Sequence, residues 1–296
     1  MRPTAALRAQ PCFLPRTLVL GSAALLLGAC STTSPTAPTP PVSAAEVGEY
    51  RAGSGILKGY LAPGEMPDSL ALVAAPPAAG SAAQASDEAT TRQLTALANG
   101  PRGALARKDA NLHFPAAASV YACALGVRIS EADTPNLNML LRRTLTDAGL
   151  ATYKAKNHYQ RTRPFVSLKL PSCTPDEEAK LAKDGSYPSG HSSLGWAWAL
   201  VLTEAAPDRA DALLQRGRAF AQSRAVCGVH WQSDIQAGML VGAGTVARLH
   251  ANETFRAQLN AARAEITAAR QAGKVPAAAD CAAEAEALTI SSLIAP

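Results

Sequence analysis

From about Asp87 onward, apolar residues recur at spacings of three and four, the period of an α-helix. In the segment 134–160, which Thr134 and Pro135 start, these residues are Leu137, Leu140, Leu141 and Leu145. Segments 191–207, 208–234 and 234–273 are also helical in pattern, and alternating strand patterns are scarce. With 48% hydrophobic residues the chain can bury a substantial core. We therefore expect an all-α domain of antiparallel helices, whose Gly and Ala positions permit close approach.

The first 29 residues have the pattern of an export signal. Three arginines, Arg2, Arg8 and Arg16, precede an uncharged apolar run from Leu18 to Ala29. At about 12 residues this run is too short to span a bilayer, which takes about 20 residues. No other segment approaches that length, so we expect the remaining chain to be a soluble body.

The run ends in "LLLGAC", which resembles the lipobox of bacterial lipoproteins, with Cys30 as the lipidated residue. The alternative is an ordinary signal peptide cut at a small residue. Ser31 follows the cysteine, and by resemblance to lipoprotein sorting this favours the periplasm with an outer-membrane anchor. Residues 30–58 begin with a Ser-, Thr- and Pro-rich stretch, so we expect a disordered tether there.

Charge and cysteine content narrow the choice of partners. The chain has 28 Lys and Arg against 23 Asp and Glu, and three of those arginines lie in the leader, so the net charge falls from +5 to +2 without it. No basic block with interleaved aromatic residues remains, which argues against a nucleic-acid polymer as partner. Four cysteines follow Cys30, namely Cys123, Cys173, Cys227 and Cys281. In an exported protein they suggest up to two disulfides, and four cysteines allow three pairings. The alternative is that they are free buried thiols.

Two segments place polar residues where a helical core avoids them. In "KNHYQRTRPF", Lys156 and Arg163 lie at the end of a helix that Pro164 stops. In "GSYPSGH", a turn at residues 188–190 leads directly into an apolar helix, and a Gly turn with a hydroxyl at a helix N-terminus is an anion site. A plain N-cap turn followed by a solvated His191 explains the second segment about as well.

The third polar segment is "SRAVCGVHWQSD", residues 223–234. His230 and Asp234 stand four apart, so on a helix they share one face and the carboxylate can accept a hydrogen bond from the imidazole. That bond fixes the tautomer and leaves the other ring nitrogen to act as nucleophile or base. The alternatives are a surface His–Asp pair or two ligands of a metal.

Taken together, the three segments read K-x6-R-P, P-S-G-H and S-R-x5-H-x3-D. This resembles the motif of the type 2 phosphatidic acid phosphatase superfamily, which includes vanadium-dependent haloperoxidases. The stretch "GSYPSGHS" is similar to the class A bacterial non-specific acid phosphatases, and it departs from them in Ser192, where Thr is common. The similarity extends through "KDANL", "DAGLATYKAKNHYQRTRPF" and "CGVHWQSD", over roughly residues 60–270. It implies a helical bundle core of the phosphatase and haloperoxidase kind.

The resemblance implies a role for each motif residue. His230 is the nucleophile that forms a phosphohistidine, Asp234 orients it, and His191 is the general acid and then the general base. The phosphoryl oxygens are held by Lys156, Arg163, Ser189, Gly190 and Arg224. Phosphoryl transfer requires mainly positioning and positive charge, so these residues need no metal and no cofactor. Because His191 starts protonated and His230 neutral, we expect activity to peak at mildly acidic pH.

We therefore expect a broad acid phosphatase acting on small phosphomonoesters, with possible transfer to other alcohols. The alternatives are a vanadate-dependent haloperoxidase, a non-catalytic phosphate-binding lipoprotein, or a lipid phosphatase. The resemblance also implies a homo-oligomer. The expected organisation is a signal peptide at 1–29, the lipidated cysteine and tether at 30–58, the phosphatase domain at 59–272 and an Ala-rich tail at 273–296.

Overall fold

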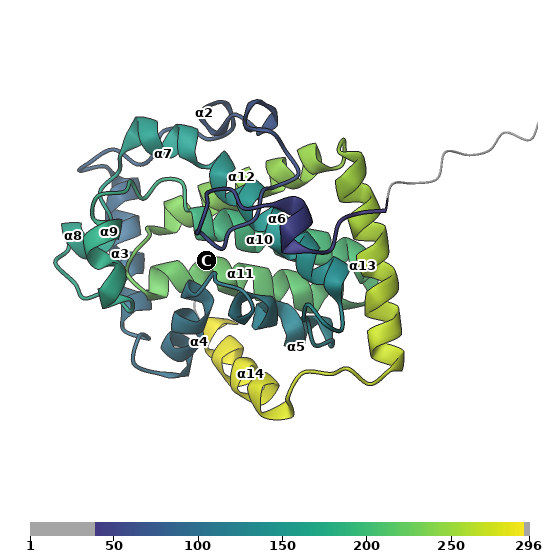
Figure 1. The fold of residues 1–296 in the computed structure, drawn as a ribbon. Coiled ribbons are helices and arrows are strands. Elements are labelled where there is room, and N and C mark those ends of the chain that lie inside the picture. The colour runs from purple at the N-terminus through teal and green to yellow at the C-terminus, as the bar shows by residue number, and fades with distance from the viewer. Residues whose placement is uncertain (1–38, 293–296) are drawn as a thin grey trace, which may run out of the picture. The chain divides into compact units, whose positions relative to one another are not determined.

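The structure is a computed structural model that describes residues 39–292. In these residues β-strands are absent, and one isolated antiparallel bridge joins Glu49 to Leu57. The export signal, Cys30 and the first part of the tether lie outside the described residues. The all-α expectation is confirmed for the described part of the chain (Figure 1).

The helices carry the labels of Figure 1. The α-helices are α1 (Ala44–Val47), α2 (Ser69–Leu72), α3 (Ala82–Thr95), α4 (Pro101–Ala110), α5 (Ala122–Leu125), α6 (Pro135–Ala151), α7 (Tyr153–Tyr159), α8 (Pro164–Ser167), α9 (Glu178–Leu181), α10 (Gly190–Ala205), α11 (Ala210–Val226), α12 (Gln232–Leu249), α13 (Glu253–Gln271) and α14 (Ala278–Ser292). Short 3-10 turns are η1 (Pro63–Glu65), η2 (Ala116–Tyr121), η3 (Pro175–Glu177) and η4 (Pro207–Arg209).

Helix α10 is the centre of the bundle, because it packs against α6, α11, α12 and α13. Its sequence is apolar on nearly every side, which is the pattern of a helix surrounded by others. Trp198 on α10 is fully buried and donates from its indole Nε1 to the carbonyl of Leu141 on α6, 2.9 Å away. Helix α13 covers α6 with Phe255, Leu259, Ala262 and Ile266.

Two glycines let α12 lie directly against the start of α10. A Cβ atom at Gly238 would lie 2.4 Å from the carbonyl oxygen of Ser189, and one at Gly242 would lie 2.3 Å from that of Ser193. No side chain fits at such distances, so the backbones pack without one between them. As a result the N-terminal ends of α10 and α12 are adjacent, and the amide of Ser189 donates to the carbonyl of Asp234 at 2.9 Å.

The described part of the expected tether is not disordered. Ser43 caps α1 through a capping box, and Leu57 is 2% exposed, with its carbonyl accepting from the Thr146 hydroxyl of α6 at 2.6 Å. Asp147 accepts from nearby backbone amides, those of Tyr60 and Leu61. Composition could not indicate this attachment, because the contacts that hold residues 57–61 come from a helix far along the chain. Leu57 and Thr146 are 89 positions apart.

The Ala-rich tail is also more structured than its composition suggests. Helix α14 packs on α4 and α11, and Glu284 pairs with the buried Arg216 at 2.9 Å. A disulfide between Cys123 and Cys281 joins α14 to α5, and a second joins Cys173 to Cys227. Of the three ways to pair these four cysteines, the structure therefore has Cys123 with Cys281 and Cys173 with Cys227.

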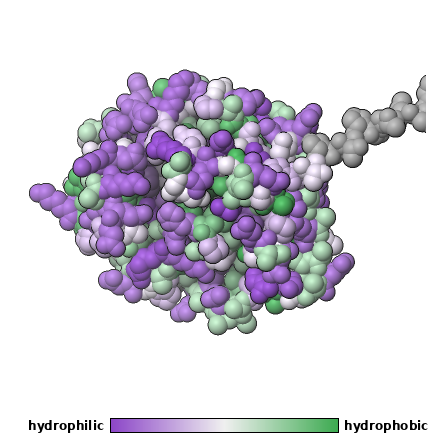
Figure 2. All heavy atoms as spheres, viewed as in Figure 1, coloured by the Kyte–Doolittle hydropathy of each residue, from purple (hydrophilic) through white to green (hydrophobic). Residues whose placement is uncertain are grey.

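Hydrophilic side chains cover much of the face shown in Figure 2, with hydrophobic residues scattered among them. Every helix within residues 39–292 is too short or too polar to cross a membrane.

Candidate active site

The phosphate-binding turn expected at residues 188–190 is present at the start of α10. Ser189 is the N-cap of the helix, and its hydroxyl oxygen accepts from the amide of Ser192 at 3.2 Å and from the Ser192 hydroxyl at 2.9 Å. With both acceptor positions used, the Ser189 hydroxyl hydrogen is left to donate. The amides of Gly190 and His191 begin the helix and have no carbonyl partner within it, so this end attracts an anion.

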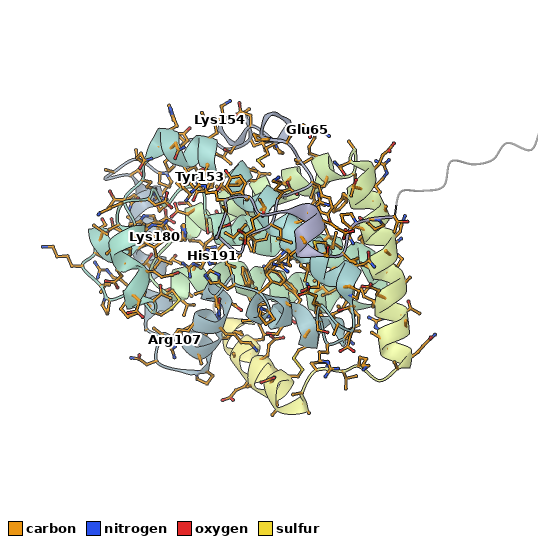
Figure 3. All side chains as sticks on the ribbon, viewed as in Figure 1. Glu65, Arg107, Tyr153, Lys154, Lys180 and His191 are labelled. Carbon is orange, nitrogen blue, oxygen red and sulfur yellow. A yellow bond between two sulfur atoms is a disulfide. The ribbon has the colours of Figure 1, made fainter. Side chains whose placement is uncertain are left out.

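His191 directly follows this turn and lies near the centre of the view in Figure 3, whereas Lys154, Lys180 and Arg107 lie toward the rim. Its Nε2 is 3.1 Å from the carbonyl oxygen of Ala110, at the end of α4, and therefore carries a hydrogen that it donates there. Nδ1 is then the ring nitrogen that can gain and lose a proton. Part of the residue reaches solvent. Burial of the ring nevertheless lowers the pKa of His191 well below its ordinary value, and Arg224 lowers it further.

His230 and Asp234 meet, but not on a helix. His230 lies in the loop between α11 and α12, Trp231 caps α12, and Asp234 is in the first turn of that helix. The expectation that both share one helical face was therefore wrong about the element, although the spacing still brings the two side chains together. His230 Nδ1 is 3.4 Å from Asp234 Oδ2, and that oxygen also accepts from the Trp231 amide at 2.9 Å.

Arg163 fixes the other side of the His230 ring. Its Nη1 lies 3.0 Å from His230 Nε2 and 3.0 Å from the carbonyl oxygen of Val229. Since a guanidinium only donates, Nε2 must accept, and the ring proton is on Nδ1, toward Asp234. Burial lowers the pKa of His230 well below its ordinary value, and the positive charges of Arg163 and Lys156 lower it further. The imidazole is thus held neutral with its Nε2 lone pair directed at the cations.

The helix-stop expected at Pro164 was wrong. Helix α7 ends earlier, at Tyr159, and its C-cap Gln160, with a φ of 44°, turns the chain out of the helix. Pro164 is the first residue of α8, with Arg163 as its N-cap. Lys156 donates from Nζ to the carbonyl of Gly185 at 2.7 Å, and Arg163 Nη2 is 3.3 Å from the same oxygen. Both cations are therefore brought to the stretch that leads into the turn at Ser189.

Buried positive charge is the main electrostatic property of the site. Lys156, Arg163 and Arg224 are 2%, 3% and 1% exposed. Burial lowers the pKa of Lys156 to about 8, and the nearby charge of Arg163 contributes to this decrease. Burial also lowers the pKa of Arg224 to about 10. The Nε and Nη1 atoms of Arg224 are buried without a hydrogen-bond partner in the described structure. Such donors are costly unless an acceptor comes to them.

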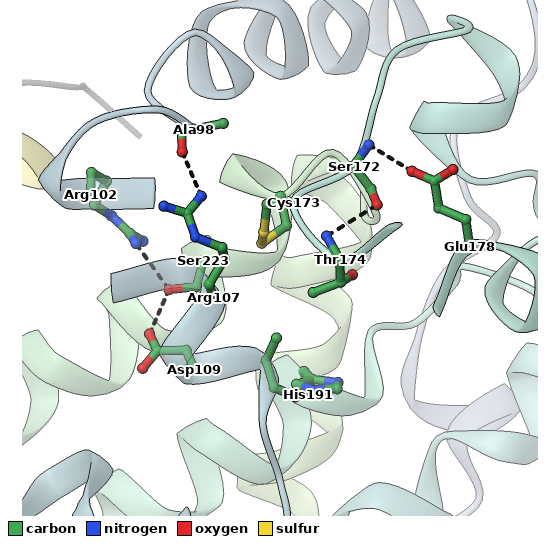
Figure 4. Close-up of a disulfide and its surroundings, with 12 residues drawn as sticks. Ala98, Arg102, Arg107, Asp109, Ser172, Cys173, Thr174, Glu178, His191 and Ser223 are labelled. Atoms are coloured by element: carbon green, nitrogen blue, oxygen red, sulfur yellow. Dashed lines mark hydrogen bonds between the residues drawn. A yellow bond between two sulfur atoms is a disulfide. The ribbon is translucent and has the colours of Figure 1, made fainter. Parts of the chain in front are cut away.

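Ser223, the neighbour of Arg224 on α11, belongs to a buried network with Arg102 and Asp109 (Figure 4). Its hydroxyl donates to Asp109 at 2.6 Å and accepts from Arg102 at 3.0 Å. Asp109 also pairs with Arg216 and directly precedes Ala110, whose carbonyl meets His191. Arg102 and Asp109 come from α4. Asp109 lies in the "KDANL" stretch of the family similarity, but neither residue had been given a role.

The structure thus brings together the ends of α7, α10, α11 and α12, and with them the predicted residues Lys156, Arg163, Ser189, Gly190, His191, Arg224, His230 and Asp234. One residue of the first motif segment had been given no role. Arg161 donates from Nη1 to Asp234 Oδ1 at 2.7 Å. Within residues 39–292, no group of three or more His, Cys, Asp or Glu is arranged to hold a metal ion.

The comparisons with known proteins agree with this geometry. Residues 138–256, which contain every predicted catalytic and phosphate-binding residue, match the PAP2 superfamily. The acid phosphatase of Zymomonas mobilis is 43% identical over 209 residues, which is 71% of this chain and 79% of that protein. The non-specific acid phosphatase of Providencia stuartii is 44% identical over 207 residues, 70% of this chain and 84% of that protein. That of Salmonella typhimurium is 44% identical over 172 residues, 58% of this chain and 69% of that protein.

Identity at this level extends over most of both chains, and in this chain the predicted motif residues meet around one cluster of buried cations. The chain therefore belongs to the class A non-specific acid phosphatases of the PAP2 superfamily.

Proposed function

We propose that this protein hydrolyses a broad range of phosphomonoesters through a phosphohistidine formed on His230, without a metal ion. The observation that carries the proposal is Arg224, a fully buried guanidinium with two unpaired donors beside an imidazole and two more buried cations. A phosphate monoester supplies what this cluster needs, namely several oxygen acceptors and negative charge in a tetrahedral shape. The relatives in Zymomonas and Providencia are acid phosphatases by name, which supports the same activity here.

In the first step the phosphoryl oxygens contact Lys156, Arg163, Arg224, the Ser189 hydroxyl and the first amides of α10. Arg163 Nη1 moves its hydrogen bond from His230 Nε2 to a phosphoryl oxygen, which frees the Nε2 lone pair. The lone pair on His230 Nε2 attacks phosphorus, and the bond to the leaving oxygen breaks. His191, doubly protonated in the complex, gives its Nδ1 proton to that oxygen, so the alcohol leaves neutral. Asp234 stays beside Nδ1 of the His230 ring during the attack, and its carboxylate stabilises the charge that develops on the ring.

In the second step water attacks the phosphohistidine, and His191 accepts the proton of the water. The bond between nitrogen and phosphorus breaks, and the electron pair returns to His230 Nε2. Phosphate leaves, and both imidazoles regain their starting protonation. An alcohol in place of water accepts the phosphoryl group in the same way, which gives phosphotransferase activity.

The test is to trap the intermediate with p-nitrophenyl phosphate carrying labelled phosphorus. The reaction is quenched in alkaline detergent, because a phosphorylated imidazole is labile in acid, and the labelled residue is located by peptide mapping. We expect label on His230, none in His230→Ala, and unchanged labelling in His158→Ala, whose ring is exposed against Tyr159. Wild-type turnover with no label on protein would refute the proposal.

We also propose that the protein is exported and held at the outer membrane by a lipid on Cys30, and that it forms a homo-oligomer. The leader sequence and two disulfides, which persist in oxidising compartments, support export. Growth with labelled palmitate should label the wild-type chain and not Cys30→Ala. Sedimentation of the protein without its leader should give a mass that is a multiple of the single chain if the oligomer exists.

A further inference from the structure

Arg161 makes the most extensive set of side-chain bonds to the site among the residues without an assigned role. It lies between α7 and α8, and its side chain is 9% exposed. Nη1 donates to Asp234 Oδ1 and to the Ser233 hydroxyl, each at 2.7 Å. Two polar residues in the first turn of α12 are thus bound by one nitrogen of one guanidinium.

The other guanidinium nitrogen reaches a different helix. Nη2 donates to Asp87 Oδ2 at 2.8 Å and to Gln84 Oε1 at 2.7 Å, both on α3. Asp87 is itself 4% exposed and accepts from the Ser233 amide at 3.0 Å. Arg161 therefore has a fixed position, since it is anchored by a buried carboxylate that is not part of the His230 site.

The guanidinium is also held from the side by an aromatic ring. Its carbon lies 5.3 Å from the centre of the Trp231 ring, and the Trp231 indole donates to the carbonyl of Thr162 at 2.8 Å. The amide of the same Trp231 donates to Asp234 Oδ2. With Oδ1 bound by Arg161 and Oδ2 by Trp231, the carboxylate of Asp234 has one orientation, with Oδ2 3.4 Å from His230 Nδ1.

We propose that Arg161, anchored by Asp87, is a positioning residue for the phosphoryl-transfer step: it holds the Asp234 carboxylate toward Nδ1 of His230 and thereby keeps the Nε2 lone pair available for attack. The inference rests on the proposed function of His230. The side-chain hydrogen bonds of Arg161 go to Ser233, Asp234, Gln84 and Asp87, so it acts on His230 through Asp234.

Electrostatics support this role. Burial raises the pKa of Asp234, and Arg161 is the largest influence that lowers it. The other charged or titratable groups around Asp234 are His230 beside it, Lys156 and Arg163 from the first motif segment, and Tyr187. Without Arg161, the Asp234 carboxyl takes up a proton at higher pH, and activity that needs the carboxylate is lost earlier as the pH falls.

The experiment compares Arg161→Met, Arg161→Lys and Asp87→Asn in the full mature chain, with the half-buried Arg143→Met as control. We expect Arg161→Met to lower kcat and the rate of phosphoenzyme formation about 10- to 100-fold, with KM changed less than about threefold. The acid limb of its pH profile should move to higher pH. Arg161→Lys keeps a cation and should recover part of the loss, Asp87→Asn should show a smaller loss in the same direction, and Arg143→Met should leave the pH profile unchanged.

A second measurement separates positioning from a general loss of folding. In the folded wild-type protein, nitrogen NMR of His230 should show the tautomer protonated on Nδ1, and Arg161→Met should shift the population away from it. The inference is overturned if Arg161→Met folds, keeps kcat within twofold and keeps its acid limb, while the wild type forms phosphohistidine. If the wild type forms no phosphohistidine at His230, the proposed function fails and this inference fails with it.

Discussion

Arg224 should oppose the stability of the free protein while it favours phosphate binding. Burial lowers the pKa of Arg224 to about 10, well below the ordinary value of an arginine, and one pH unit corresponds to about 1.4 kcal/mol, so the buried charge costs about 3 kcal/mol at neutral pH. Removing the charge with Arg224→Met, which keeps most of the side-chain volume, should therefore raise the free energy of unfolding by about 1–3 kcal/mol in phosphate-free buffer.

The same substitution should weaken phosphate binding. Truncating one member of a buried charged pair costs about 2–4 kcal/mol, which corresponds to about 30- to 1000-fold in the dissociation constant. Calorimetry with inorganic phosphate measures that constant directly, even in a variant without activity. Added phosphate at 100 times its dissociation constant should stabilise the wild type by about 2.7 kcal/mol, and much less in the variant at the same concentration.

The assay is urea denaturation of both proteins with and without phosphate. Arg218→Met is the matched control, because Arg218 lies on the same helix and is exposed, and it should change neither quantity. The reasoning is refuted if Arg224→Met lowers stability in phosphate-free buffer and binds phosphate as the wild type does. That result would mean that the guanidinium is satisfied within the protein.

Three further outcomes are expected. His191→Ala should reduce kcat more on alkyl phosphates than on p-nitrophenyl phosphate, because a good leaving group needs no proton; equal losses would argue against the acid role. The pKa of His191, followed by NMR, should lie below its ordinary value of 6.5 in the free protein and rise by about one unit or more when phosphate binds, since an adjacent anion favours the charged ring; an unchanged pKa would contradict this. Cys281→Ser removes the disulfide that closes a loop of 158 residues and should lower the free energy of unfolding by about 2–5 kcal/mol in urea, whereas no change would show that α14 needs no bridge.

In the proposed mechanism, the pH dependence of catalysis is coupled to the substrate through His191. In the free protein its pKa is lowered by burial and by Arg224, which disfavours the protonated form that an acid must have. A bound phosphate ester places negative charge among the same cations and restores that form. We therefore expect the mildly acidic optimum to be a property of the complex, with His230 neutral in the free enzyme.

The sequence by itself predicted the helices and the residues that meet at the candidate site. A spacing of three and four marks α6 and α13, and the continuous apolar run after His191 marks α10 as the buried central helix. The Ser189 cap, the cations at 156, 163 and 224 and the pair at 230 and 234 were all identified from the three-part motif and its resemblance to the phosphatase superfamily. The residues of each motif lie within about a dozen positions of one another. Over that range a sequence pattern can indicate which side chains lie close together.

Tertiary structure alone decided which distant residues support that site. Arg161 meets Asp87 across 74 positions, and Ser223 meets Asp109 across 114, so neither pair has a spacing that a pattern could reveal. The cysteine pairing, the attachment of Leu57 to α6 and the packing of α14 arise in the same way. Burial also changed the chemistry, because the pKa values of Lys156, Arg224 and both histidines depend on how much water the packed helices exclude. Residue types are fixed by the chain, whereas desolvation and long-range contacts exist only once the bundle has formed.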